Sequence, residues 1–326
     1  DGADESVVTI TFSEGVTAFS NDDLVVEGGT LTELTSNASN TVWTGTFTAT
    51  DDSTTNAKVK FADAANYTDV TGNDGATDVE AVAVVDTVSP DLAASGIEIT
   101  AANLNDATNT SVVTITFTEA VTEFNNSDIT VTGGTLSTVG SNDGGVTWSG
   151  IFTASDDSTA NGTITIGTDY QDLVGNVGAD GGTDSVVVDT INPTATVTFA
   201  EDGLDDDTNE SLVTIVFSEA VANFSNADVS VVGGTLGTLT SADQITWTAT
   251  FTASDDSTEE ASVTVIGEYE DNVGNIGATG ADDTATVDTT NPTATIVFDQ
   301  TSLKKETGSD GADESVVTIT FSEGVT

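Results

Sequence analysis

The side chains of this chain that could do chemistry are almost all carboxylates. Asp and Glu number 55 against 4 Lys and Arg, and His, Cys and Met are absent. Calcium takes six to eight oxygen ligands, largely carboxylates and carbonyls, whereas zinc and copper favour the nitrogen and sulfur ligands that are missing here. Converging carboxylates therefore predict a calcium site wherever the fold brings them together.

The candidate ligands belong to short motifs that recur along the chain. An Asp pair precedes Ser-Thr, an Asp follows Val near each proline, a Glu follows Phe-(Ser/Thr), and an Asp and an Asn belong to each Y-x-D-x-x-G-N motif. In a seven-stranded sandwich, alternate loops share a pole, so the end of one repeat should face the start of the next. The predicted metal ligands at the first junction are Asp51, Asp52, Asp86, Glu119, Asp172 and Asn176. Those at the second are Asp156, Asp157, Asp189, Glu219, Asp271 and Asn275, with Asn192 from the linker.

Two alternatives stay open for these carboxylates. The metal site could lie wholly within one pole, using the Glu, the Asp of the last loop and the chain's own carbonyls. Asp-Asp before Ser-Thr and D-x-x-G-N are also common tight turns, so the side chains could simply be solvated. Within the second junction, Asp189, Glu219 and Asp271 are the strongest candidates.

The same composition argues against several classes of function. Triad hydrolases need His, thiol chemistry needs Cys, and neither dinucleotide-binding nor phosphate-loop motifs occur. Paired carboxylates can cleave glycosides, but these pairs recur in every repeat at turn positions, which is typical of architecture. A formal charge of −51 disfavours nucleic acid and anionic membranes as partners. The sequence also contains no run of about 20 apolar residues, which a membrane-spanning helix would need. We therefore expect no enzymatic activity.

Internal repeats of about 100 residues carry these motifs. Phe12, Phe117, Phe217 and Phe321 are equivalent, at spacings of 105, 100 and 104. This size is that of one sandwich domain with its own core. The predicted domains are 1–87, an Ig-like domain without its first strand; 88–190 and 191–289, two further Ig-like domains; and 290–326, the first strands of another.

The strands that must position the carboxylates can be read from alternation. Val8, Ile10 and Phe12 alternate with polar residues, as expected of a strand with one buried face. Trp148 precedes a small residue, Gly150, which we interpret as leaving space for a core indole. Seven strands are predicted in the second repeat, at 96–100, 111–118, 128–132, 135–139, 146–154, 162–168 and 183–188. The fold class is therefore all-β, in tandem Ig-like antiparallel sandwiches of about seven strands each, and short proline linkers favour an extended rod.

These motifs resemble a known family. F-S-E-x-V, F-x-N-x-D, G-G-T-L, W-x-(G/A)-x-F-T-A, Y-x-D-x-x-G-N and V-D-T-x-x-P are together similar to the bacterial Ig-like repeats of giant surface adhesins, including biofilm-associated and RTX-type adhesins. The resemblance implies an Ig-like fold, exposure on the bacterial cell surface or secretion, type I export and calcium-dependent rigidity. The expected partners are calcium ions and neighbouring repeats. A multi-chain fibre, sheath or surface layer, and a module that binds sugar or ice, remain the alternatives.

One stretch of sequence occurs twice. DGADESVVTITFSEGVT spans Asp1–Thr17 and returns unchanged as Asp310–Thr326, 309 residues later. The sister repeats match it less well, so three dissimilar domains form a larger period. We expect the two copies to mark the ends of a segment taken from a longer repetitive protein. Chains that meet head to tail, one supplying a strand that another lacks, are the alternative.

Overall fold

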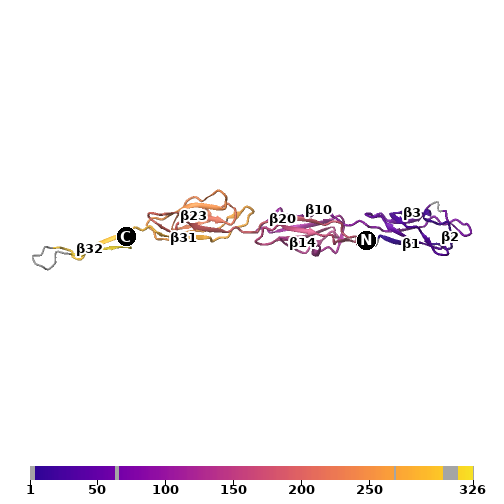
Figure 1. Cartoon of the computed structure of the whole chain (residues 1–326), viewed down its shortest axis with the longest axis horizontal. Coiled ribbons are helices and arrows are strands. Elements are labelled where there is room, and N and C mark those ends of the chain that lie inside the picture. The colour runs from indigo at the N-terminus through magenta and orange to yellow at the C-terminus, as the bar shows by residue number, and fades with distance from the viewer. Residues whose placement is uncertain (1–3, 63–65, 268, 304–314, 326) are drawn as a thin grey trace. The chain divides into compact units, whose positions relative to one another are not determined.

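The computed structural model describes residues 4–62, 66–267, 269–303 and 315–325. Figure 1 shows a chain built from strands, and the helices of the described residues are three single 3-10 turns. The chain divides into two compact units, residues 1–104 with 108–189 and residues 105–107 with 190–326. Each unit is described by itself.

The first unit begins with a sandwich of two sheets. One sheet has the order β1-β6-β4, with β5 beside β6, and the other has the order β3-β7-β9. A short ladder, β2 with β8, closes one end. The elements are β1 (Glu5–Thr11), β2 (Val16–Thr17), η1 (Asn21–Asp23), β3 (Leu24–Glu27), β4 (Gly29–Leu31), β5 (Thr35–Ser36), β6 (Val42–Ala49), β7 (Ala57–Phe61), β8 (Thr68–Asp69) and β9 (Glu80–Ala83).

The second sandwich of this unit has one more strand at the edge of each sheet. Its sheets have the orders β10-β12-β17-β15, with β16 beside β17, and β11-β20-β18-β14; β13 pairs with β19. The elements are β10 (Leu92–Ile99), β11 (Asn103–Leu104), β12 (Thr110–Phe117), β13 (Val121–Thr122), η2 (Asn126–Asp128), β14 (Ile129–Thr132), β15 (Gly134–Leu136), β16 (Gly140–Ser141), β17 (Thr147–Ala154), β18 (Gly162–Ile166), β19 (Gln171–Asp172) and β20 (Gly182–Val188).

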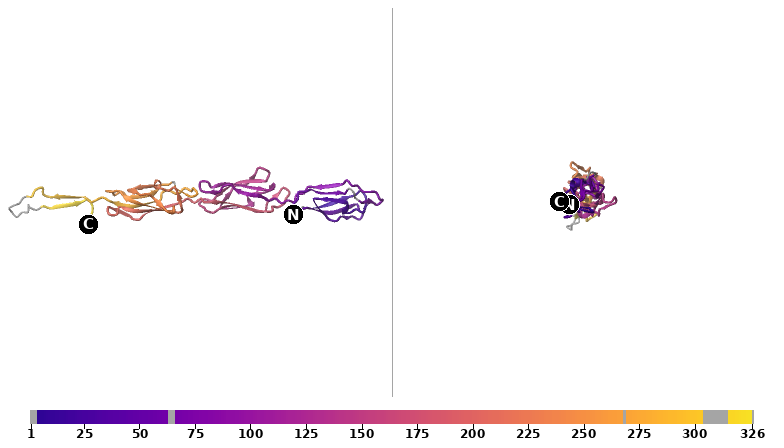
Figure 2. Two further views of the ribbon diagram at one scale, coloured as in Figure 1. Left: turned by 90° about the horizontal axis from the view of Figure 1, so that it is seen from above. Right: turned by 90° about the vertical axis from the view of Figure 1, so that its right-hand side faces the viewer.

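The second unit contains a sandwich of the same topology and a separate hairpin of β32 with β33, drawn in yellow in Figure 2. Its sheets are β21-β23-β28-β26, with β27 beside β28, and β22-β31-β29-β25; β24 pairs with β30. The elements are β21 (Ala195–Phe199), β22 (Gly203–Asp205), β23 (Glu210–Phe217), β24 (Val221–Ala222), η3 (Asn226–Asp228), β25 (Val229–Val232), β26 (Gly234–Leu236), β27 (Thr240–Ser241), β28 (Thr246–Ala253), β29 (Ala261–Val265), β30 (Glu270–Asp271), β31 (Asp282–Asp288), β32 (Ala294–Phe298) and β33 (Val317–Phe321).

The seven strands predicted for the second sandwich are all present. Their bounds shift by a few residues; β10, for example, begins at Leu92 rather than at residue 96. The short strands β11, β13, β16 and β19 were not predicted. One pairing also departs from an antiparallel arrangement, because β11 runs parallel to β20.

Alternating side chains form the cores as expected. In β12, Val113, Ile115 and Phe117 are at most 2% exposed, while Val112, directly before Val113, faces solvent. Many of the aromatic ring pairs meet edge to face, which is a favoured geometry for buried rings, and the others are tilted. Phe124, for example, lies 5.1 Å from Phe117 between ring centres. Each complete sandwich therefore has its own hydrophobic core.

The tryptophans lie at the core margin, and the reason for the small residue beside them differs from the prediction. Trp148 is half-buried and its ring lies 5.3 Å from that of Phe124. A Cβ added at Gly150 would meet Val139 at 3.2 Å and Leu136 at 3.3 Å, not the indole. The interpretation that this glycine makes space for the tryptophan was wrong: it makes space for Leu136 at the end of β15 and for Val139 in the loop that follows.

Two glycines of the second sandwich give a matched test of this packing. A Cβ at Gly134 would lie 2.2 Å from the carbonyl oxygen of Thr153 and 2.6 Å from the ring of Phe152, whereas one at Gly140 would meet nothing within 4 Å. We expect Gly134→Ala to lower the free energy of unfolding by about 1–3 kcal/mol. Gly140→Ala should change it by less than about 0.5 kcal/mol. Chemical denaturation monitored by Trp148 fluorescence, in a chain whose Trp43 and Trp247 are replaced by Phe, measures both. Equal effects would contradict the described packing.

Candidate cation-binding site

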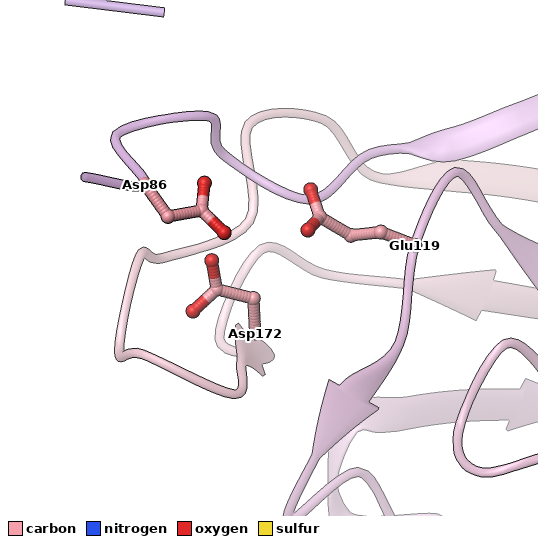
Figure 3. Close-up of side chains that lie close together, drawn as sticks. All are labelled: Asp86, Glu119 and Asp172. Atoms are coloured by element: carbon pink, nitrogen blue, oxygen red, sulfur yellow. The ribbon is translucent and has the colours of Figure 1, made fainter. Parts of the chain in front are cut away.

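Three carboxylates of the first unit converge at one point. Asp86, Glu119 and Asp172 each offer an oxygen atom, and these three atoms all lie within 4.8 Å of one another. Figure 3 shows the three carboxyl groups pointing toward a shared space. Asp172 is buried, whereas Asp86 and Glu119 are half-buried. The structure thus brings together three of the six residues that the sequence predicts as ligands at this junction.

Three different segments position this carboxylate cluster. Asp86 follows β9 at the start of the Pro90 linker, Glu119 lies in the tight turn between β12 and β13, and Asp172 ends β19. The ladder between β13 and β19 pairs Val121 with Asp172. Because this ladder joins the two loops of the second sandwich, it holds Glu119 and Asp172 near each other.

Asp172 is held by donors from its own loop. Its Oδ1 accepts hydrogen bonds from the backbone N–H groups of Val174, Gly175 and Asn176 at 2.8, 2.7 and 2.9 Å. Its Oδ2 accepts one from Asn176 Nδ2 at 2.7 Å. Burial raises the pKa of Asp172, but these hydrogen bonds outweigh burial and leave its pKa below the usual value. Asp172 is therefore a fixed, ionised carboxylate.

Glu119 has the opposite balance. Burial raises the pKa of Glu119, and the neighbouring charges of Asp86 and Asp172 raise it further. Like charges that share a site disfavour ionisation, so the cluster carries an electrostatic cost as long as all three groups are ionised. A bound cation would remove that cost.

Asn176 ties the linker to the second sandwich. Its Nδ2 donates to the carbonyl oxygens of Asp86 and Val88, each at 3.1 Å. Because the amide nitrogen makes these contacts, Oδ1 is the ligand atom that Asn176 could offer. The role of the linker carbonyls was not anticipated; the only sequence signal was the recurrence of Asn in each Y-x-D-x-x-G-N motif beside a proline linker.

The Asp pairs do not join the carboxylate cluster in the described residues. Asp51, Asp52, Asp156 and Asp157 are exposed, and Asp52 and Asp157 adopt φ values of +49° and +48°. Asp tolerates this left-handed conformation better than most residues, which suits a tight turn. For these four residues the geometry matches the alternative of a solvated turn.

The second unit contains a matching pair of carboxylates. Glu219 and Asp271 offer oxygen atoms within 4.8 Å of each other. Asp271 accepts hydrogen bonds from Val273, Gly274 and Asn275, as Asp172 does from its loop, and Asn275 is fully buried. Asp189 is the last residue of the first unit.

One linker oxygen lacks a donor. In the described residues, Oδ1 of Asn192 is buried and makes no hydrogen bond. A buried carbonyl oxygen without a hydrogen-bond donor is unfavourable, and a donor or a bound cation would relieve that cost.

A search of the described residues for membrane spans found no helix with the length and hydrophobicity to cross a bilayer.

Comparison with solved structures returns several bacterial proteins at low similarity. Invasin, a bacterial integrin-binding protein, is 15% identical, with a TM-score of 0.34 over 92% of this chain and 63% of that one. The Yersinia pseudotuberculosis protein InvD is 16% identical, with a TM-score of 0.27 over 68% and 65%, and the adhesin InvE from the same organism is 14% identical, with a TM-score of 0.26 over 60% of each chain. The chain thus spans less than two thirds of each of these proteins. Among curated proteins, none matches it significantly in sequence.

The sequence comparison with protein families is more specific. The family described as "Bacterial Ig-like domain" matches three times in succession, over residues 1–84, 86–188 and 189–287. These matches cover most of the chain and coincide with the three sandwiches. The chain belongs to the bacterial Ig-like domain family.

Proposed function

We propose that this chain is a non-enzymatic structural part of a large bacterial surface adhesin, exposed outside the cell. It forms a spacer that projects an adhesive module for attachment or biofilm formation, and calcium bound near the linkers stiffens this spacer. Membership of the bacterial Ig-like family supports the structural role. The single observation that carries the calcium proposal is the convergence of Asp86, Glu119 and Asp172.

The geometry of the carboxylate cluster fits calcium. Two oxygens that both contact an ion at about 2.4 Å can lie at most about 4.8 Å apart, and the three ligand atoms satisfy that limit. Calcium would need further oxygens to reach six to eight ligands, which carbonyl groups and water supply in many sites. The all-oxygen donor set, rich in carboxylates, suits calcium better than a transition metal.

The proposed ion would act on the linker. Asp86 belongs to the end of the first sandwich, whereas Glu119 and Asp172 belong to the second. An ion that binds all three would replace mutual repulsion with attraction and add to the hydrogen bonds that Asn176 makes to the linker. Calcium would thereby restrict bending at this linker.

Removal of calcium should lower thermal stability. An ion present at 100 times its dissociation constant stabilises a site that exists only in the folded state by about 2.7 kcal/mol. We therefore expect the melting temperature of the second sandwich to fall by several degrees when EDTA replaces calcium, as measured by scanning calorimetry. Equal melting in calcium, magnesium and EDTA would rule out the proposed site.

Substitution of Glu119 should have opposite effects with and without calcium. In EDTA, Glu119→Gln should leave stability unchanged or raise it, because it removes a carboxylate whose ionisation is disfavoured by burial and by Asp86 and Asp172. In calcium titrations followed by calorimetry, the same variant should weaken binding on the order of 10-fold or more. Glu14→Gln is the matched control, since Glu14 lies in the equivalent F-(S/T)-E motif but in no cluster of the described residues. A loss of stability in EDTA would identify Glu119 as a structural residue instead.

The spacer role can be separated from direct ligand binding. One set of cells would display a binding module of known specificity at the end of this chain, and a second set would display the same module on a membrane anchor without the chain. The number of cells that attach under flow to a surface coated with the module's ligand would be counted. We expect the chain to raise attachment in calcium, and EDTA to reduce that gain. Attachment by the chain without the added module would contradict a spacer and favour a ligand-binding domain.

A further inference from the structure

In the second and third sandwiches, part of the first strand runs parallel to the last strand. The first strand of the third sandwich is divided between the two sheets: β21 pairs with β23 in one sheet, and β22 pairs with β31 in the other. The second sandwich repeats this arrangement with β10, β11 and β20. Because β22 and β31 run in the same direction, a pull on the two ends of the sandwich draws them in opposite directions along their length.

Backbone hydrogen bonds and buried side chains hold this parallel pair together. Leu204 lies opposite Val287, and the two are 3% and 6% exposed. The backbone N–H and the hydroxyl group of Thr286 both donate to the carbonyl oxygen of Asp202, at 2.9 and 3.1 Å. Sliding of β22 along β31 would therefore break hydrogen bonds and bring apolar side chains into water.

One aspartate in each of the two sandwiches ties the other half of the first strand to the last strand. Asp283 of β31 accepts a hydrogen bond from the backbone N–H of Phe199 in β21, and Asp184 of β20 accepts one from that of Ile99 in β10, each at 2.8 Å. Both aspartates are half-buried and lie on the core-facing side of their strands. Asp is uncommon in strands, and its burial is costly without a hydrogen bond. We call this contact, which joins the two sheets, the aspartate clip.

We propose that the parallel pair and the aspartate clip together form a latch that bears tension on the chain. In a strand ladder the hydrogen bonds run between neighbouring strands. A pull along the strands loads all of these bonds at once, whereas a pull across one end of the ladder breaks them one after another. The inference adds a mechanical property to the proposed spacer and involves no bound ion, so measurements in EDTA test it apart from the calcium proposal.

The aspartate clip controls how early the latch opens. Tension that enters from the preceding linker reaches β21 before β22. Among the described residues, β21 has a ladder on one side only, with β23, and the clip at Phe199 joins its last residue to β31. Without the clip, β21 can slide along β23 and leave β22 to carry the load. Contacts that break before the transition state set the rate of forced unfolding, and the clip belongs to these contacts.

The first test compares two directions of pull on the third sandwich of the full chain. The sequence contains no cysteine, so a pair of introduced cysteines fixes where the handles of an optical-tweezers experiment attach. Ile191→Cys with Thr290→Cys would load the latch along its strands. Thr194→Cys with Ser218→Cys would open the ladder of β21 and β23 from one end, where the backbone N–H of Ser218 donates to Thr194.

We expect a higher unfolding force for the first pair of handles than for the second, with both pairs measured in EDTA. The physical reason is that the first geometry shears the parallel pair and the clip together. Equal forces, or a higher force for the second pair, would overturn the proposal. This comparison needs no change to the clip, so it decides the proposal even if a variant of the clip does not fold.

Two neighbouring aspartates provide a matched pair of variants for the clip. Asp283 faces the core, whereas Asp282, directly before it, is exposed. With handles at positions 191 and 290, Asp283→Ala should raise the unfolding rate at constant force about 10-fold, as expected for the loss of a hydrogen bond to a charged acceptor. Asp282→Ala should leave that rate unchanged. An unchanged rate in the Asp283 variant, or an equal increase in both variants, would overturn the proposal.

A third variant separates the latch from general stability. Leu239 is 6% exposed and follows β26, which lies at the opposite edge of its sheet from β21. Leu239→Ala should lower the midpoint of chemical denaturation, followed by Trp247 fluorescence in a chain whose Trp43 and Trp148 are replaced by Phe, at least as much as Asp283→Ala does. It should nevertheless raise the unfolding rate under force by a smaller factor. Unfolding rates under force that simply follow the denaturation midpoints would overturn the proposal.

Discussion

The structure depends on how carboxylates are stabilised when almost no basic side chains are available. Among the described residues the only salt bridge is that of Lys58 with Glu80, at 3.4 Å and near the surface, where such pairs contribute little. Backbone N–H groups take the place of Lys and Arg. Asp172 and Asp271 each accept three of them within one loop, and Asp128 closes a capping box at its 3-10 turn. Hydrogen bonds to the ionised form of a carboxylate keep it charged.

This constraint explains why the acidic motifs have fixed companions. The glycine and asparagine after Asp172 form a tight loop whose N–H groups converge on the carboxylate, and Gly175 adopts a φ of +101° that favours glycine. The same loop surrounds Asp69 in the first sandwich, where no cluster of carboxylates occurs in the described residues. The hydrogen bonds of the loop alone therefore explain why an aspartate occupies this position of the Y-x-D-x-x-G-N motif. They do not account for Glu119, whose pKa is raised, and this residue is the part of the cluster that points to a cation.

Much of the fold could be predicted because alternation and repetition are strong signals. Val113, Ile115 and Phe117 face the core as their spacing indicates, and three copies of each motif showed which segments of the repeats are equivalent. The convergence of Asp86, Glu119 and Asp172 also followed from which loops share a pole. What escaped prediction depends on contacts between distant segments. The parallel pairing of β11 with β20 and the aliphatic neighbours of Gly150 have no local signature.

The Asp pairs show the limit of composition as a guide. In the sequence, Asp51 and Asp52 look as suitable for metal binding as Asp86, but Asp52 adopts a left-handed turn conformation and neither residue joins the cluster.

The most direct test of the calcium proposal is anomalous diffraction from a crystal grown with calcium. We predict a peak at about 2.3–2.6 Å from oxygens of Asp86, Glu119 and Asp172. A well-ordered cluster with no anomalous peak, or calcium bound only at the Asp pairs, would contradict it.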